Sequence, residues 1–321
     1  MLPQIKKSKD SHTLDGNQLR AAFSYGIKQL SLNKDLVNCI NILPVPNGDT
    51  GDNIQKTLLS ALSEMNDDQH VGNQAAQCAR GALAGAHGSS GIILANFLIG
   101  LANALQDRDV ASISDIIDAV NKGCVKASIE ISDPLPGGIC DICGAINQKL
   151  SGIPAGNQTL ADIITLIYNT VLSALGEEVE KNVLLSKIGI NDAGATGFFY
   201  FLEGIYRYTM DEPLERDKSE WPSFNVPEDI LIKGVLYTVE FLINNVTLPV
   251  QEIKKSLSDI GSPVLIAYEG GETVKVLIRT TDPRKVFDRS ARFGRSTMIR
   301  VDDLIDEQKY FLSKIHTKDV I

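Results

Sequence analysis

Residues 41–53 read NILPVPNGDTGDN, and this stretch decides how the chain around it is interpreted. Two prolines stiffen the approach to a turn that two glycines loosen, and apolar residues recur at helical spacing directly after it. The side chains that carry oxygen in this turn are Asn47, Asp49, Asp52 and Asn53. Such a turn either caps the start of a helix or offers ligands to a hard cation such as Mg²⁺, and the residues alone leave both interpretations open.

The sequence on both sides of this turn has a helical pattern, from Leu14 to about Tyr208. Apolar residues recur at helical spacing after Asp15 and again after the turn. Further helical patterns follow at about 73–86, 90–106, 111–130, 140–151, 159–179 and 195–209. Because strand patterns are almost missing here, we expect an all-α domain of eight helices.

A charged stretch with three prolines, residues 211–229, separates this part from the rest and is typical of a connector. After it the period changes. The patterns predict strands at 235–243, 263–268, 273–280 and 297–302 and helices at 249–260 and 283–293. The order β-α-β-β-α-β is that of a ferredoxin-like α+β domain. We therefore expect a tail at 1–13, a helical domain at 14–209, a linker at 210–230 and a smaller α+β domain at 231–321.

The composition narrows the class of protein. A length of 321 residues suits two domains, because single cores usually stop growing at roughly 250 to 300 residues. The net charge of -9 argues against a broad surface for nucleic acid or for an anionic membrane, since such partners require clustered Lys and Arg. No apolar segment of a secretory signal follows the basic N-terminal residues. We expect a soluble cytoplasmic protein that binds no nucleic acid and has no membrane span.

The cysteines form an odd set of five, which suits reduced thiols better than a disulfide framework. Only Cys140 and Cys143 have the spacing of a motif, CxxC. A lone CxxC without a second pair or nearby histidines is weak evidence for zinc, and a redox motif would need a strand before it. The pattern favours plain thiols at the start of a helix.

A second glycine-rich turn lies at residues 81–97, GALAGAHGSSGIILANF, directly before an apolar helix. Small residues at a helix N-terminus expose free N–H groups and the positive end of the helix dipole, which together suit a phosphate. A helix cap or a close helix crossing remains the alternative, and the lysine of a Walker A loop is missing. Glycine-rich turns recur at residues 133–143 and 189–204. Four such turns on one helical domain predict a nucleotide site at one end of a bundle.

These residues resemble the DhaL domain, the nucleotide-binding half of dihydroxyacetone kinases, and more closely the bacterial fatty acid kinases. The family pattern NxFPVPDGDTGTN is similar to residues 41–53, GALxGARGNSGVIL to 81–94, and VDAGGQGLLYLLEG to 191–204. The resemblance covers about residues 14–209. It implies a barrel of eight antiparallel helices that holds ATP and two Mg²⁺ ions at one end.

The resemblance also implies roles for single residues. Asp49 is expected to be the catalytic Mg²⁺ ligand, with Asn41 and Asn47 at neighbouring ligand positions. Asn47 replaces an aspartate of the family, and the spacing suggests the hypothesis that Asp52 restores the lost carboxylate. The residues expected at the nucleotide are Asn53, Gly88, Ser89, Ser90, Gly91, Gly138, Asp192 and Gly194.

The second domain resembles the middle domain of fatty acid kinase, in YTVEF at 237–241 and VKVLIRTTDP at 274–283. Members of that family have a cysteine and two histidines where this chain has Thr238, Leu277 and Arg279. Because no thiolate or imidazole is left at these positions, we expect no zinc there. The further C-terminal region through which the family is thought to engage a fatty-acid-binding partner has no counterpart in these residues.

The leading interpretation is an ATP- and Mg²⁺-dependent phosphotransferase of the DhaL type. It would transfer the γ-phosphate to a small acceptor such as dihydroxyacetone (glycerone) or a protein-bound fatty acid, with a separate acceptor-carrying protein and a homodimer as expected partners. The alternative is a catalytically degenerate nucleotide-binding or regulatory module, because the middle-domain cluster is missing. A purely structural helical protein is a third reading. Both the kinase and the regulatory module would bind nucleotide, whereas a structural protein would not. Only the kinase would also turn the nucleotide over.

Overall fold

A computed structural model of the chain describes residues 10–129, 131, 134–153, 156–218, 222 and 224–317. Parts of five predicted segments lie outside these residues: positions 1–9 of the tail, 130 of the predicted helix 111–130, 132–133 of the third glycine turn, 219–221 and 223 of the linker, and 318–321 at the end of the second domain.

The first part of the structure is helical and ends with α9. Its helices are α1 (Gly16–Cys39), α2 (Thr50–Glu64), α3 (Val71–Gly85), α4 (Gly88–Leu105), α5 (Ile113–Ile129), α6 (Ile139–Ser151), α7 (Leu160–Glu178), the 3-10 turn η1 (Val179–Lys181), α8 (Val183–Ile188) and α9 (Ala193–Met210). Each long helix packs against the next one along the chain, and α9 packs against both α7 and α1. The predicted helical domain is confirmed. Neither the short α8 nor the pairing of β1 (Thr13–Leu14) with β2 (Ala111–Ser112) was expected.

Local signals explain where these helices begin and why they are buried. Asp15 and Gln18 form a capping box at the start of α1, in which each side chain accepts a hydrogen bond from the other residue's N–H at 2.8 and 3.0 Å. Helix α4 is the most apolar, and Leu94, Leu98 and the residues around them are buried in the core. By length and composition α4 and residues 160–177 of α7 could each cross a membrane, but 61% of α4 is buried inside the protein, as expected of a core helix.

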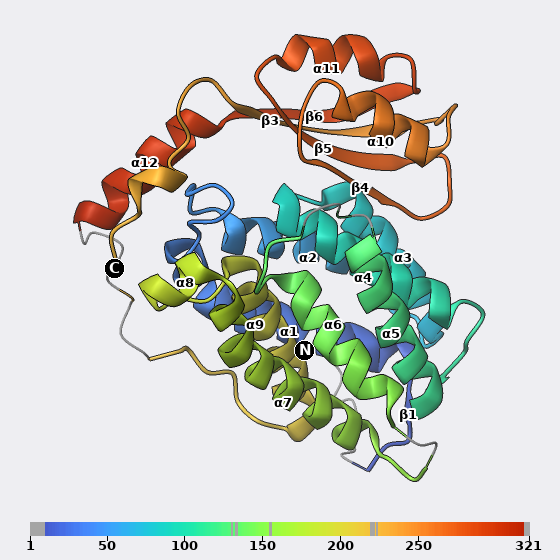
Figure 1. The fold of residues 1–321 in the computed structure, drawn as a ribbon. Helices are drawn as coiled ribbons and strands as arrows, with labels where there is room; N and C mark the ends of the chain where they lie inside the picture. Colours follow the sequence, from blue (N-terminus) through green and yellow to red (C-terminus); the bar gives the residue numbers. More distant parts are fainter. Residues whose placement is uncertain are drawn as a thin grey trace.

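The second part is a four-stranded antiparallel sheet with two helices. After the 3-10 turn η2 (Glu228–Ile230) its elements are β3 (Tyr237–Asn244), α10 (Val250–Ser258), β4 (Val264–Tyr268), β5 (Val274–Thr280), α11 (Pro283–Ser290) and β6 (Arg295–Asp303). The strand order is β4-β5-β3-β6, and all neighbours are antiparallel. This is the topology that the predicted β-α-β-β-α-β order requires. Figure 1 shows α10 and α11 on the sheet face that points away from the helical domain.

The alternation of side chains along the strands gives the sheet two different faces. Val239 and Phe241 on β3 pack into the core beneath α10 and α11. Leu265 and Leu277 point the other way and belong to the core of the helical domain. Strands β3, β4 and β5 are therefore buried on both faces, whereas the edge strand β6 is largely exposed. The inner face of the sheet forms a boundary with α3 and α4.

A helix that the sequence patterns did not predict follows the sheet. Helix α12 (Leu304–Thr317) begins where the Asp303 carboxylate accepts the N–H of Ile305 at 2.9 Å. Its Phe311 is 6% exposed and packs in the core of the helical domain. A side chain at Gly48, whose φ is +67°, would collide with the Phe311 ring. Helix α12 thus connects the sheet to the 41–53 turn.

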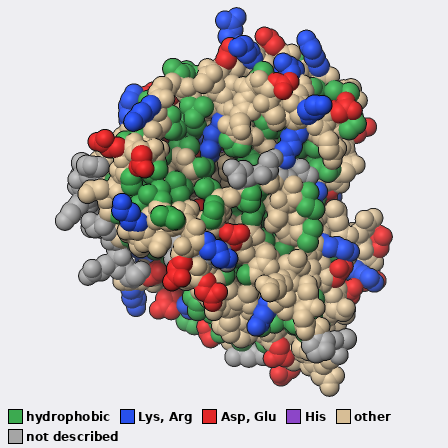
Figure 2. Space-filling model, in the orientation of Figure 1, with side chains coloured by type: hydrophobic (Ala, Val, Ile, Leu, Met, Phe, Trp, Pro, Cys, Tyr) green, Lys and Arg blue, Asp and Glu red, His purple; other side chains and the backbone are tan. Residues whose placement is uncertain are grey.

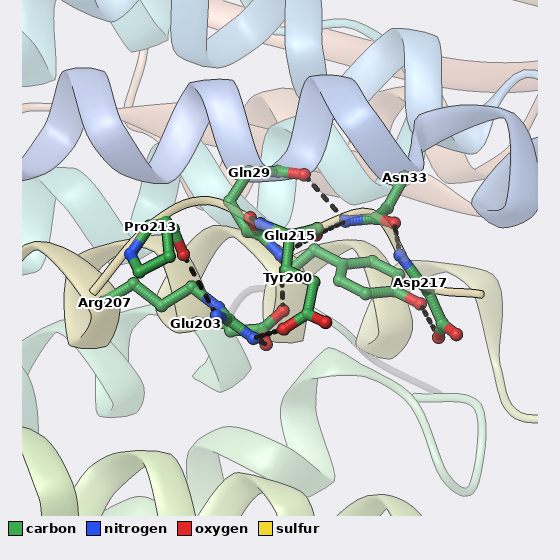
Figure 3. Close-up of polar contacts among 8 residues, drawn as sticks. All are labelled: Gln29, Asn33, Tyr200, Glu203, Arg207, Pro213, Glu215 and Asp217. Atoms are coloured by element: carbon green, nitrogen blue, oxygen red, sulfur yellow. Dashed lines mark hydrogen bonds and ion pairs between the residues drawn. The ribbon is translucent and has the colours of Figure 1, made fainter. Parts of the chain in front are cut away.

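The start of the linker is attached to the helical domain by hydrogen bonds. Gln29 on α1 accepts the N–H of Glu215 at 3.0 Å and donates to the carbonyl of the same residue at 2.7 Å. One turn later, Asn33 accepts the N–H of Asp217 at 2.7 Å, and Tyr200 on α9 donates to the Asp217 carboxylate at 2.7 Å. Figure 3 shows these contacts together with those of Glu203, Arg207 and Pro213. This part of the linker is an ordered strap and not a free connector.

Candidate functional site

The glycine-containing turns of the helical domain meet at a cavity of about 550 Å³. A β-carbon on Gly88 would fall 2.5 Å from the Asn53 side chain, and one on Gly194 would fall 2.9 Å from Ser90 Oγ, so turns far apart in sequence lie in contact. The predicted site residues on the cavity wall are Asn41, Asn47, Asp49, Asn53, Gly88, Ser89, Ser90, Gly138, Asp192 and Gly194. The structure therefore brings together most of the predicted set.

The opposite wall of the cavity comes from the sheet domain and α12. The residues that contribute charge or polarity there are Thr238, Glu240, Lys254, Arg279, Arg300, Asp302 and Glu307. Figure 2 shows the surface hollowed where the two domains meet, with Lys and Arg side chains along that junction. The site lies between the domains, whereas the motifs had placed it on the helical domain alone.

The 41–53 turn is capped by asparagines from outside the α2 helix. Asn41 Oδ1 accepts the N–H groups of Asp49 and Thr50 at 3.0 and 3.1 Å, and Asn38 Oδ1 accepts the next two N–H groups at 2.7 and 3.2 Å. Asp49 occupies the N-cap position, but its side chain makes no capping hydrogen bond. Different residues of this turn therefore fill the two roles that the sequence left open. Asn41 serves the helix start, and the Asp49 carboxylate is left for the cavity.

The environment of Asp49 suits a cation. Burial raises the pKa of the Asp49 carboxyl, while a hydrogen bond from Asn53 and the charge of Arg300 lower it. Among the described residues no group of three or more His, Cys, Asp or Glu side chains could by itself hold a metal ion. Mg²⁺, however, is commonly held by one or two carboxylates together with phosphate oxygens. Asp49 fits that role, because it is partly desolvated and uses no oxygen for capping.

Asn47 contacts a carboxylate that the motifs did not reveal. Its amide donates to Glu307 Oε2 on α12 at 3.0 Å. Burial raises the pKa of Glu307 to about 7, and the carboxylates of Asp49 and Asp302 act in the same direction. The position where the family has an aspartate therefore still has a carboxyl group within hydrogen-bond distance, supplied by another part of the chain.

The structure does not bring Asp52 to the cavity. Its carboxylate accepts hydrogen bonds from Lys34 Nζ at 2.6 Å and from Asn38 Nδ2 at 2.9 Å, on the α1 side of α2. Partial burial raises the pKa of Asp52, but Lys34 and Asn38 lower it further, so that the pKa lies below its ordinary value. The hypothesis that Asp52 replaces the carboxylate lost at Asn47 does not fit this geometry, because both carboxylate oxygens of Asp52 are bound by side chains of α1.

The start of α4 already holds one anionic group. The N–H of Gly88, which has a φ of +63°, donates to Glu240 Oε1 on β3 at 2.7 Å. Among the described residues the N–H groups of Ser89 and Ser90 have no protein acceptor, as expected for the first turn of a helix. Gly91 donates to the His87 carbonyl at 3.1 Å and is absent from the cavity wall, so its predicted place at the nucleotide is not observed.

The third and fourth turns form the remaining side of the cavity. Asp192 caps α9 by accepting the N–H of Ala195 at 2.8 Å, and burial raises its pKa to about 6. Gly138 is the N-cap of α6, and a β-carbon there would lie 3.9 Å from Asp192. Burial also raises the pKa of Cys140 to about 11, and all five cysteines are free, which agrees with plain thiols.

Two arginines on the sheet wall differ in their surroundings. Arg300 binds the Asp302 carboxylate at 2.7 Å and lies 4.0 Å from Glu307. Arg279 lies opposite Thr238 in the β3–β5 register, and its Nε is buried without a hydrogen-bond partner among the described residues. Sequence reasoning had named Thr238 and Arg279 only as departures from the family. Glu240, Arg300 and Glu307 were missed, because only the docking of the two domains brings them to the site.

Comparison with known families agrees with this arrangement. The profile of the DAK2 domain matches residues 44–207, half of the chain, from the first glycine turn into α9. The chain belongs to the DAK2-domain family. The profile of the middle domain of fatty acid kinase-like proteins matches residues 234–310, which contain the whole four-stranded sheet. The predicted resemblance to DhaL domains close to fatty acid kinase is thereby confirmed.

Relatives of this DAK2-domain protein have the same two parts aligned. It is 25% identical over 305 residues to an uncharacterized protein of Staphylococcus epidermidis, and 26% identical over 312 residues to an uncharacterized protein of Staphylococcus aureus. Each alignment covers 90% of this chain and 55% of the relative. The chain thus spans about half the length of the curated relatives it matches.

Proposed function

We propose that this DAK2-domain protein is a phosphotransferase of the dihydroxyacetone and fatty acid kinase type, which binds ATP with Mg²⁺ in the cavity between its two domains. The carrying observation is the position of Asp49. Asn41 and Asn38 cap α2, so the Asp49 carboxylate faces the same cavity as the free N–H groups of Ser89 and Ser90. A carboxylate for the cation and a helix N-terminus for phosphate, side by side, suit the binding of a metal–nucleotide complex.

In this proposal each wall of the cavity has its own task. Asp49 holds the cation, while Asn47 and Glu307 bind it directly or through water. Bound Mg²⁺, of which the family resemblance implies two ions, would neutralise charge on the phosphate oxygens. Ser89 and Ser90 donate N–H and O–H groups to the phosphates. The apolar residues Ile131, Leu135 and Ile139 suit the nucleoside.

The acceptor and the partners are part of the proposal. Phosphoryl transfer depends mostly on alignment and on charge neutralisation, so the site sets few chemical requirements on the acceptor. We infer a small molecule such as dihydroxyacetone, or a fatty acid presented by a separate cytoplasmic protein, and a homodimer joined through the sheet domain. The closed packing order from α1 to α9 supports the eight-helix antiparallel barrel that the resemblance implies.

A second function is favoured by one contact. Glu240 already occupies the N–H of Gly88, a position where a phosphate oxygen would otherwise bind. A phosphate oxygen that takes this N–H must displace the Glu240 carboxylate, so that binding of nucleotide would break a contact between the two domains. This alternative is a regulatory module that binds nucleotide and reports it through the contact between the domains.

The test is calorimetric titration with MgATP, followed by assays of phosphoryl transfer. We expect wild-type protein to bind MgATP and Asp49→Ala to bind it at least about 10-fold more weakly, since a charged ligand to the metal complex is lost. The matched control is Asp288→Ala, an exposed carboxylate on α11. Binding without transfer to dihydroxyacetone, or to a fatty acid with its carrier, would leave the regulatory module. Absence of MgATP binding would exclude both functions.

A further inference from the structure

Arg279 is directed into the cavity by the alternation of side chains on β5. Val276 and Ile278 pack in the core beneath α10 and α11. Leu277, between them, packs in the core of the helical domain. Arg279 shares the Leu277 face and lines the cavity next to Thr238, its partner on β3. The guanidinium is thus presented to the helical domain from a rigid strand in the middle of the sheet.

The guanidinium of Arg279 lacks the pairing that its neighbours have. Arg300 is paired with Asp302 at 2.7 Å, and Lys275 lies 3.7 Å from Glu240. Within the described part of the chain Arg279 makes no ion pair and no side-chain hydrogen bond, and its Nε is fully buried. Buried charges are normally paired, because desolvation of an unpaired one is costly. An anion that enters the cavity would supply the missing partner.

The position of Arg279 in the cavity indicates which part of an anionic ligand it would bind. Arg279 lies opposite Thr238, which shares a face of β3 with Glu240, and Glu240 accepts the N–H of Gly88. Gly88 contacts the side chain of Asn53, which in turn donates a hydrogen bond to Asp49. In agreement with this proximity, burial lowers the pKa of Arg279 and the charge of Asp49 acts against this effect. Arg279 therefore lies at the metal end of the cavity. In a nucleotide that extends from the apolar wall toward Asp49, the terminal phosphate reaches this end.

We propose that Arg279 binds the terminal phosphate of a nucleoside triphosphate and so lets the protein distinguish a triphosphate from a diphosphate. The guanidinium fork matches two phosphate oxygens, and it approaches from the sheet domain while Ser89 and Ser90 approach from the helical domain. This inference rests on the proposed nucleotide site and adds to it a residue that links the sheet domain to the length of the phosphate chain.

The experiment compares the affinities for MgATP and MgADP by calorimetry, with a non-hydrolysable ATP analogue as a further ligand. We expect Arg279→Ala to weaken binding of the triphosphates about 10- to 100-fold and to change MgADP binding less than about 2-fold, because only the terminal phosphate loses a charged hydrogen bond. Arg279→Lys should retain part of the preference, since it keeps the charge but loses the fork. Arg284→Ala, an exposed arginine on α11, is the matched control.

Two outcomes would overturn the proposal while leaving the proposed function intact. One is an equal fold loss of MgATP and MgADP affinity in Arg279→Ala, and the other is that the substitution changes neither affinity. Thermal unfolding adds a readout that separates a ligand-binding residue from a structural one. Since the unpaired charge is costly without ligand, Arg279→Met should unfold at the same or a higher temperature than wild type, and a lower temperature would indicate a structural role. If wild-type protein binds neither nucleotide, the proposed function fails together with this inference.

Discussion

The amide of Asn47 donates to the carboxylate of Glu307 across 3.0 Å, and the two residues belong to different parts of the fold. Asn47 lies in the turn before α2, and Glu307 lies in the first turn of α12. The family pattern has an aspartate where this chain has Asn47, so the carboxyl group at this corner of the cavity now comes from α12. This corner of the cavity therefore depends on how α12 docks on the helical domain.

Restoring the family residue tests that relationship. Asn47→Asp would place a second carboxylate against Glu307, and like charges at this separation repel strongly in a partly buried site. We expect the variant to unfold at a lower temperature than wild type at pH 8 without Mg²⁺, and to gain more stability than wild type when Mg²⁺ is added. The double variant Asn47→Asp/Glu307→Gln should recover the metal-free stability. Equal melting temperatures for the single variant and wild type in metal-free buffer would contradict the contact.

The ion pair between Asp52 and Lys34 is predicted to stabilise the fold in a pH-dependent way. The pKa of Asp52 lies below the ordinary value, so the ion pair with Lys34 stabilises the fold fully above the unfolded pKa of about 3.9, and this stabilisation is lost as the pH falls through the folded pKa. Asp52→Asn should therefore lower the stability at pH 7 by less than about 1 kcal/mol, with the difference shrinking below about pH 4. Chemical denaturation at several pH values measures this. A weaker Mg²⁺-dependent affinity for nucleotide in Asp52→Asn would return Asp52 to the set of metal ligands.

Gly88 is predicted to be irreplaceable at the start of α4. Its positive φ is unfavourable for a residue with a β-carbon, and that atom would fall 2.5 Å from Asn53. Gly88→Ala should cost about 1–3 kcal/mol in the free energy of unfolding and should also weaken MgATP binding. The control is Gly144→Ala inside α6, where an added β-carbon meets nothing within 4 Å and should stabilise by about 0.5–1 kcal/mol. Equal effects of the two substitutions would argue against this role for the turn.

Phe311 is predicted to hold α12 on the helical domain. Replacing a buried phenylalanine by alanine typically costs about 3–5 kcal/mol, and here the loss should appear first as local opening of α12. Hydrogen exchange in Phe311→Ala should accelerate in α12 while α1 and α9 remain protected. The neighbouring Tyr310, which is 61% exposed, provides the control Tyr310→Ala. Faster exchange throughout the helical domain would instead show that Phe311 supports the whole core.

Much of the fold could be predicted because its signals are local. The capping box at Asp15, the helical spacing of apolar residues and the alternation on β3 and β5 each act within a few residues. Most of the site residues predicted in segments 41–53 and 81–97 line the same cavity. They could be predicted for the same reason, since a glycine turn and the helix after it form one local unit. The position of Asp49 and Ser90 on one cavity could thus be predicted from the sequence alone.

The features that were missed depend on contacts between distant parts of the chain. The helical spacing of Leu304, Phe311 and Ile315 in α12 is a local signal that was overlooked, whereas the surface on which Phe311 and Ile315 pack lies in another domain and no pattern in one segment identifies it. Glu240 and Glu307 look like ordinary acidic residues until docking places them against Gly88 and Asn47. The position of Asp52 away from the cavity could not be foreseen for the same reason. Spacing along a helix indicates which residues are near Asp49, but not that Lys34 on α1 binds the carboxylate first.

The strap that Gln29 and Asn33 hold against α1 has a consequence for how the two domains stay together. Because Gln29 and Asn33 bind the linker at residues 215 and 217, and Phe224, Val226 and Ile230 pack against the helical core, only a short length of chain separates these contacts from β3. A short tether gives the detached domain an effective concentration in the millimolar range, so that reclosure is an intramolecular event. The apolar packing of Leu265 and Leu277 in the helical core therefore does not need to be strong on its own to favour the arrangement in which the cavity is enclosed between the two domains.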